Sequence, residues 1–253
     1  MKDEKKEISR RDVLIGAGTI AAGAAVLSTG VASFVSNAKA SGVTVYPYKA
    51  LNIEEVGRIA HETYFTKFCA ETVMTALFNP LEKSVGEPYA SFPLNSVFWA
   101  HGGMMGWGTG CGTLIGAGMA VGLITGGSKD GEAIINDVIA YYADTELPTY
   151  KPAKGQATAE IQNTSLADTP LCHISVGKWM KKENVGFFTA ERKERCARLS
   201  ANIAMYTAQL LNEWSEGKYK PRNKPLANVL DNQITSQSNC MECHGDKVPT
   251  PIT

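Results

Sequence analysis

The chain has 253 residues with 25 Lys or Arg and 25 Asp or Glu, so its formal net charge is zero. This length suffices for one globular domain with a substantial core. The balanced charge argues against nucleic acid or an anionic membrane surface as a partner, because both favour an excess of basic residues.

Residues 1–40 have the pattern of an export signal. Arg10 and Arg11 precede an uncharged run, Val13 to Ala38, and the run ends in a small-x-small cleavage site at Ala38-Lys39-Ala40. The run is rich in Gly and Ala, so it resembles a twin-arginine signal more than a membrane anchor, the alternative interpretation. We expect a cleaved signal, a periplasmic protein and no membrane span in the mature chain. Twin-arginine export of folded proteins also suggests a cofactor inserted in the cytoplasm.

Removal of the signal takes away six basic and four acidic residues and leaves 19 and 21, a net charge of −2. The remaining sequence predicts an all-α domain over residues 41–216, followed by a polar segment over 217–253. Apolar residues recur near the helical period over 52–78, and Asn79-Pro80 is expected to end that helix. No strand-like alternation of useful length occurs.

Four further helical segments are predicted after this one. A glycine cluster at 101–110 leads to a helix from Cys111 to about Ile124, whose small residues allow close approach to its neighbours, and another helix covers 130–144. After a polar loop at 148–169, Thr169 is the expected N-cap of a helix and Pro170 its first residue. The last helix runs from Thr189 to about Glu216, and its charged stretch at 191–195 is expected to face solvent.

Residues 240–244 read Cys-Met-Glu-Cys-His, the pattern of covalent haem c attachment. The thiols of Cys240 and Cys243 can each form a thioether to the porphyrin, and His244 can then bind the iron as proximal ligand. A zinc half-site or a chance pair of cysteines are the alternatives. The tail after His244 contains no further Cys or His, which weakens the zinc interpretation.

Four other cysteines, each in its own segment, are candidate ligands of an iron–sulfur cluster: Cys69, Cys111, Cys172 and Cys196. Cys111 and Cys172 are expected at helix starts, where unpaired backbone N–H groups favour the thiolate, so both should ionise readily. Two disulfides are an alternative in an exported protein, and buried free thiols are another.

The segments around these cysteines resemble a four-cysteine putative redox family over roughly residues 52–215. The hallmark of that family is C-G-A-x-x-G, which Cys111-Gly112-Thr113-Leu114-Ile115-Gly116 matches except for Thr113 in place of Ala. With the C-x-x-C-H motif added, the chain is similar to the split-Soret cytochromes c of sulfate-reducing bacteria. This resemblance implies a homodimer with one haem c and one iron–sulfur centre in each subunit.

The same resemblance implies two adjacent haems, each with two histidine ligands, the sixth ligand coming from the partner subunit. Of the remaining histidines we rank His101 first as this distal ligand, because it precedes the glycine cluster where a flat cofactor can approach. His61 and His173 follow in that order. Three methionines are further alternatives: Met104, Met105 and Met180.

These features predict an electron carrier rather than an enzyme. Electrons would pass between cluster and haem and between the haems of a dimer, in the course of anaerobic respiration. A small-molecule reductase and a redox or gas sensor, each with an open coordination position, are the competing interpretations. The nuclearity of the cluster is left open, with 2Fe–2S considered first, and the redox partner proteins are not identified.

Overall fold

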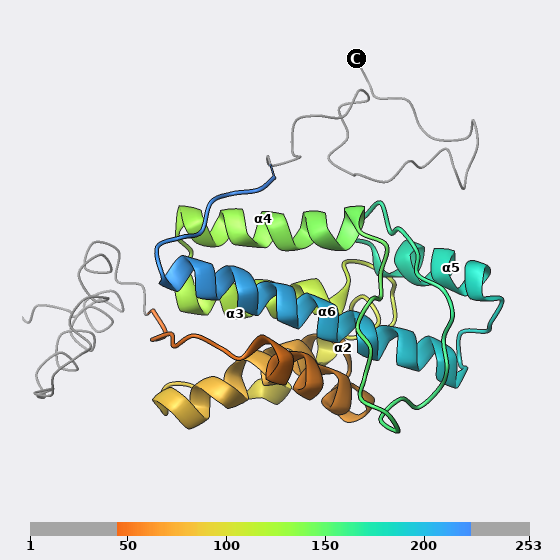
Figure 1. Cartoon of the computed structure of the whole chain (residues 1–253), viewed down its shortest axis with the longest axis horizontal. Helices are drawn as coiled ribbons and strands as arrows, with labels where there is room; N and C mark the ends of the chain where they lie inside the picture. The colour runs from red at the N-terminus through yellow and green to blue at the C-terminus, as the bar shows by residue number, and fades with distance from the viewer. Residues whose placement is uncertain (1–44, 224–253) are drawn as a thin grey trace, which may run out of the picture. The chain divides into compact units, whose positions relative to one another are not determined.

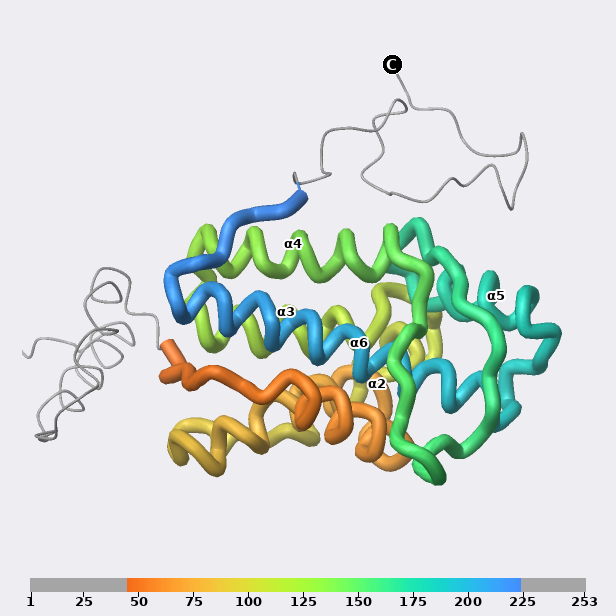
Figure 2. The backbone as a smooth tube through the Cα atoms, viewed as in Figure 1, coloured from red at the N-terminus to blue at the C-terminus, as the bar shows by residue number. Residues whose placement is uncertain are grey.

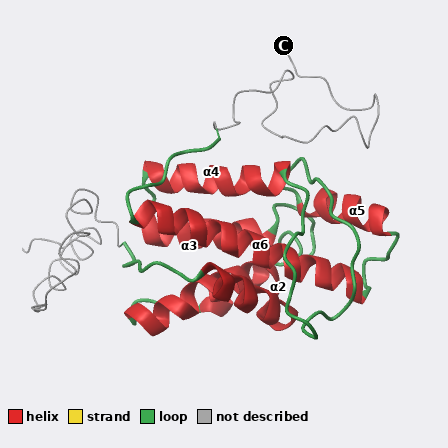
Figure 3. Ribbon diagram, in the orientation of Figure 1, coloured by secondary structure: helices red, strands yellow, loops and turns green. Residues whose placement is uncertain are grey.

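The computed structural model describes residues 45–223, and the described part of the chain is helical without any strand (Figures 1 and 3). The predicted signal at 1–40 and the predicted haem ligands Cys240, Cys243 and His244 lie outside these residues. The elements in chain order are α2 (Ile53–Val85), the 3₁₀ helix η2 (Leu94–Ala100), α3 (Gly112–Thr125), α4 (Lys129–Asp144), α5 (Cys172–Glu183) and α6 (Ala190–Ser215). The all-α prediction is therefore confirmed.

Helix α6 organises the core. It packs most extensively on α2 and also contacts α3 and α4, and it runs between α4 and α2 in Figure 2. Its inward face buries Leu199, Ile203 and Leu210. Each such side chain contributes roughly 1.5–3 kcal/mol when fully removed from water. Helix α5 lies at one end of the bundle, near the start of α6 (Figure 1).

Helix α2 differs from its prediction at two places. It continues through Pro80 to Val85 and ends at Gly86 (φ 85°), so the expected end at Asn79-Pro80 is wrong. Proline removes one helical hydrogen bond, but Phe78 and Leu81 on either side of it stay buried in the core and hold the segment helical. The helix is also broken at Phe68 (φ 56°, ψ −158°), one residue before Cys69.

Helix α3 begins at the predicted place, with Cys111 as its N-cap residue. Two of its glycines are required by close packing. A Cβ atom at Gly112 would lie 1.9 Å from the carbonyl oxygen of Ala100, and one at Gly116 would lie 2.4 Å from that of Ala70. The predicted close approach of this helix to its neighbours is thus confirmed.

Helix α5 begins two residues later than predicted. Its N-cap is Leu171, not Thr169, and its first residue is Cys172, not Pro170. Leu171 forms an antiparallel bridge with Gly110, and the Pro170 carbonyl accepts a hydrogen bond from the Cys111 N–H. This pairing keeps Leu171 extended (φ −77°, ψ 127°), so the helix starts only after it. The start of α6 agrees with the prediction, since the Thr189 side chain caps it by accepting a hydrogen bond from the Arg192 N–H.

The residues after α6 return to α4. Tyr219 donates its hydroxyl to Asp137 at 2.7 Å, and the backbone N–H groups of Arg222 and Asn223 also donate to this buried carboxylate. The segment at 217–223 is therefore anchored on the helical domain. None of the described helices has the length and apolar character to cross a membrane.

Candidate metal centre

The structure brings the four candidate cysteines together from four helices. Cys69, Cys111, Cys172 and Cys196 are all buried, and none forms a disulfide in the described structure. Burial, followed by the charges of Cys111 and Cys196, raises the pKa of Cys69, and interaction with Cys111, followed by burial, raises the pKa of Cys172. The four cysteines, of which the first and last lie more than 120 positions apart in the sequence, thus bring their sulfur atoms into one group.

Backbone pairing between two helix starts holds Cys111 and Cys172 in register. The Cys111 N–H donates to the Pro170 carbonyl at 2.9 Å, and the Cys172 N–H donates to the Thr109 carbonyl at 2.7 Å. The next amide, that of His173, donates to the Gly108 carbonyl at 3.1 Å. These hydrogen bonds leave both thiols at the first turns of α3 and α5.

The break in α2 and the glycine after Cys111 bring Cys69 to the same place. Phe68 takes a left-handed conformation, so Cys69 opens the second part of α2. A Cβ atom at Gly112 would lie 2.7 Å from the Cβ of Cys69, which shows how closely α3 approaches this residue. Only glycine permits that approach.

The environment separates the pKa values of the thiols. The hydrogen bond from Cys172 is the largest cause that lowers the pKa of Cys111 to about 6, and Thr113, whose Oγ1 lies 3.2 Å from the sulfur, lowers it further against the effect of burial. The same hydrogen bond, with burial, raises the pKa of Cys172. Burial and the neighbouring Cys111 and Cys196 raise the pKa of Cys69 to about 12. The prediction of a readily ionised thiol is confirmed for Cys111 and wrong for Cys172.

Two buried polar groups beside the cysteines lack partners. The Nε of Arg195 and the hydroxyl of Tyr142 make no hydrogen bond in the described structure. The Arg195 guanidinium donates through Nη2 to Ser175 and lies 3.8 Å from the Cys196 sulfur through Nη1. Sequence reasoning missed Arg195 because it placed residues 191–195 on a solvated face, whereas Glu194 and Arg195 are buried. Its position directly before Cys196 was the signal available.

Four thiols and a buried guanidinium whose Nε lacks a partner suit an anionic metal–sulfur group. Cysteine thiolates are the usual ligands of iron–sulfur clusters and also bind zinc. Among the described residues no three His, Cys, Asp or Glu side chains are arranged around a point that a single metal ion could occupy.

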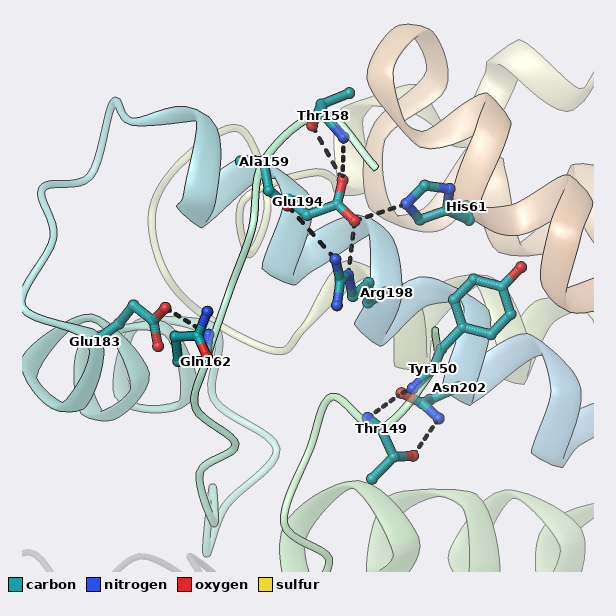
Figure 4. A network of polar contacts seen from close by, with 10 residues as sticks. All are labelled: His61, Thr149, Tyr150, Thr158, Ala159, Gln162, Glu183, Glu194, Arg198 and Asn202. Carbon is teal, nitrogen blue, oxygen red and sulfur yellow. Dashed lines mark hydrogen bonds and ion pairs between the residues drawn. The ribbon is translucent and has the colours of Figure 1, made fainter. Parts of the chain in front are cut away.

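His61 belongs to a different polar network, which Figure 4 shows. Its Nε2 lies 3.0 Å from Oε1 of the buried Glu194, which also accepts hydrogen bonds from Arg198 Nε at 2.7 Å and from Thr158. Burial would raise the pKa of Glu194, but the hydrogen bonds from His61, Arg198 and Thr158 outweigh it and lower the pKa to about 2. His61 is only 2% exposed, so it is poorly placed to reach a haem of another subunit.

His101 and His173 lie at the glycine cluster. The half-buried His101 ring packs between Phe68 and Phe98, with ring centroids 5.4 and 5.0 Å away. His173 is exposed, and its Nδ1 lies 2.9 Å from the carbonyl oxygen of Gly108. Of these two, only His173 has one ring nitrogen fixed by the backbone while the other remains available.

The glycine cluster also carries an exposed apolar surface, which we call the loop surface. Its large side chains are all at least 38% exposed, with Trp107 at 84%: Phe98, Trp99, Met104, Met105 and Trp107. Met104 and Met105 both have positive φ (63° and 52°), which turns the chain tightly here. A monomeric soluble domain rarely exposes so many neighbouring apolar side chains.

Comparison with known proteins gives consistent results. Over 256 aligned residues the chain is 29% identical to the split-Soret cytochrome c of Desulfovibrio desulfuricans, covering 95% of this chain and 88% of that protein. A solved structure, described as showing a novel iron centre in that cytochrome, matches with a TM-score of 0.67 and 29% identity over 80% of this chain and 82% of the other. The resemblance expected from the sequence is thereby confirmed. Residues 67–210 match the model of the putative redox-active protein family (C_GCAxxG_C_C), and this chain belongs to that family.

Proposed function

We propose that this chain is an electron-transfer protein with an iron–sulfur cluster on Cys69, Cys111, Cys172 and Cys196 and a haem c in its C-terminal segment. The observation that carries the proposal is the meeting of four buried cysteines from four helices beside the buried Arg195, whose Nε has no hydrogen-bond partner. The similarity to a cytochrome c whose structure is described by its iron centre supports a redox protein of the cytochrome type.

The residues around the sulfur atoms would set the properties of such a cluster. A bound cluster supplies reversible one-electron transfer. The Thr113 hydroxyl lies within hydrogen-bond distance of the Cys111 sulfur, and burial keeps water away. A backbone hydrogen bond from Gly102 offsets part of the rise that burial causes in the pKa of Cys69. Hydrogen bonds to sulfur and exclusion of solvent are the main means by which a protein tunes a cluster potential.

For the haem, the C-x-x-C-H motif predicts attachment at Cys240 and Cys243 and proximal ligation by His244. For the distal ligand we now place His173 ahead of His101 and His61. A histidine that binds a metal through one nitrogen usually donates its other N–H to a carbonyl or carboxylate. His173 meets this requirement through the Gly108 carbonyl and is exposed, so it can reach a partner subunit.

The proposal includes a homodimer located in the periplasm after twin-arginine export. The loop surface supports the dimer, because it is apolar, exposed and adjacent to both His101 and His173. A second copy of this chain that covers the loop surface would remove its side chains from water. It would also bring the haem of that copy close to the distal histidine of the first. The signal-like residues 1–40 support the location.

Measurement of iron and acid-labile sulfide per haem tests the cluster. We expect inorganic sulfide and more than one iron per haem in the purified full-length protein, and loss of sulfide in the Cys111→Ser variant. One iron per haem without sulfide would contradict the cluster and favour disulfides. Replacement of Cys240 by Ser should remove covalent haem and leave the sulfide.

The visible spectrum of two histidine variants tests the distal ligand. His173→Ala should convert a low-spin haem to a high-spin haem that binds carbon monoxide, while His101→Ala should leave it low-spin. The opposite pattern would return His101 to first place. Rapid and complete carbon monoxide binding by the native reduced protein would favour the reductase or sensor interpretation over the electron carrier.

A further inference from the structure

Arg195 is a fully buried charge that no carboxylate balances in the described structure. Its exposed fraction is 1%, and its hydrogen bonds go to the hydroxyl of Ser175 at 2.7 Å and the carbonyl of Ser175 at 3.3 Å. Its Nε has no partner. A buried ion without a counter-ion costs several kcal/mol, so an anion is required at this position.

The groups that surround the guanidinium identify this anion. Arg195 directly precedes Cys196 on α6. Cys196 lies 3.8 Å from Nη1. The Cys196 sulfur, one of the four proposed cluster ligands, is therefore within reach of the Arg195 charge.

The neighbouring arginines on α6 do not share this situation. Arg192 is only half-buried, donates to the Phe187 carbonyl at 2.7 Å and lies over the Phe187 ring. Arg198 pairs with the buried Glu194 at 2.7 Å. Arg195 alone of the three is fully buried and directed at the cysteine group.

We infer that Arg195 is the counter-ion of the four-cysteine cluster and a positioning residue that raises its reduction potential. This inference rests on the cluster assigned under the proposed function. Reduction adds one negative charge to the cluster, and a fixed positive charge in a medium of low dielectric constant stabilises the reduced form more than the oxidised form. A bound cluster supplies more negative charge at this position than the metal-free thiols do, so Arg195 should stabilise the loaded protein more than the metal-free protein.

Replacement of Arg195 by Met, which keeps most of the side-chain volume and removes the charge, tests both consequences in the full-length protein. In the loaded protein we expect the ratio of reduced to oxidised cluster at a fixed solution potential to fall at least tenfold. For a one-electron couple this is a shift of about 59 mV to more negative potential. We also expect the fall in the unfolding midpoint to be larger in the loaded protein than in the metal-free protein.

Two controls distinguish a counter-ion from a purely structural residue. Arg198→Met removes a charge paired with Glu194, so it should lower the stability of the loaded and metal-free forms alike and leave the cluster potential unchanged. Arg195→Lys keeps the charge and should hold the reduced-to-oxidised ratio within tenfold of wild type.

The possible outcomes separate this inference from the proposed function. Absence of sulfide from the wild-type protein would reject the cluster itself. A loaded Arg195→Met variant with an unchanged potential would overturn the counter-ion role and leave the cluster intact. An equal fall in the unfolding midpoint of the loaded and metal-free forms of Arg195→Met would also overturn it, because the inference requires a charge that acts mainly on the bound cluster.

Discussion

At the scale of single residues, Thr113 and Glu194 show how polar contacts decide chemistry in this core. Thr113 follows Gly112, which stands where the GCAxxG pattern of the family has alanine, and the Thr113 hydroxyl lies 3.2 Å from the Cys111 sulfur. Glu194, which is fully buried on α6, accepts hydrogen bonds from three residues. In both cases a hydrogen bond to the charged form favours ionisation.

Thr113→Val should raise the pKa of Cys111 above its value of about 6, because it removes a hydrogen bond to the thiolate. The thiolate absorbance of the metal-free protein as a function of pH measures this change. Thr207→Val is a matched control, since the Thr207 hydroxyl bonds to the Ile203 carbonyl within α6. An unchanged titration in the Thr113 variant would show that this hydroxyl does not act on the sulfur.

Glu194 should make the domain sensitive to acid. Its pKa in the folded protein, about 2, lies below the ordinary value of 4.5. The ionised carboxylate therefore contributes its full share to the free energy of unfolding above pH 4.5, and this contribution is lost as the pH falls toward 2. The loss should amount to about 3 kcal/mol. Urea unfolding across this range would measure it, and the Glu194→Gln variant should lack this pH-dependent part. An equal slope in variant and wild type would contradict the assignment.

His61→Ala should destabilise the protein by about 2–4 kcal/mol, because it leaves a cavity and removes one donor from the buried Glu194. The haem spectrum should not change, since His61 is not the expected sixth ligand. A high-spin haem in this variant would instead support His61 as the ligand. Denaturant unfolding and the visible spectrum together decide between the two roles.

At the scale of elements, helix α3 determines how closely the ligands can approach. Its first residues pair with the start of α5, and its glycines lie against η2 and α2. The hydrophobic periodicity predicted the extent of this helix well. Periodicity could not show that α2 continues past Pro80. That continuation depends on the burial of Phe78 and Leu81 against residues distant in sequence.

Gly112→Ala should destabilise the domain by at least about 2 kcal/mol and lower its iron content, since the added methyl group would collide with the Ala100 carbonyl next to Cys69. Gly122→Ala on the same helix is the matched control. Nothing lies within 4 Å of a Cβ atom there, so the change should stabilise the helix by about 0.5–1 kcal/mol. Thermal unfolding and iron analysis of both variants measure the difference. Equal behaviour of the two variants would show that the close approach at Gly112 is not needed.

At the scale of the whole molecule, two exposed aromatic regions lie on the helical domain. The loop surface adjoins the candidate haem ligands, whereas Phe187 and Phe188 precede α6 and are 48% and 88% exposed. Exposure alone does not distinguish them. The position of the loop surface beside His101 and His173 is the reason for assigning the dimer contact to it.

Trp107→Asp should dissociate the proposed dimer, because it places a charge in the apolar loop surface. Sedimentation measurements over a range of protein concentrations would show a monomer for this variant. Phe188→Asp removes a side chain of similar exposure, 88% against 84%, and should leave the dimer intact. Dissociation by Phe188→Asp but not by Trp107→Asp would move the interface to that region.

The sequence by itself determined the helical class, the extents of α3, α4 and α6, and the six cysteines with their candidate roles. These features depend on local periodicity, on caps such as Thr189, and on residue types that carry their own chemistry. Only the tertiary structure decided that four distant cysteines meet, that Arg195 is buried beside them, and that His61 serves Glu194 while His173 faces solvent. The physical reason is that burial and charge compensation arise from packing between helices, which local sequence patterns do not encode.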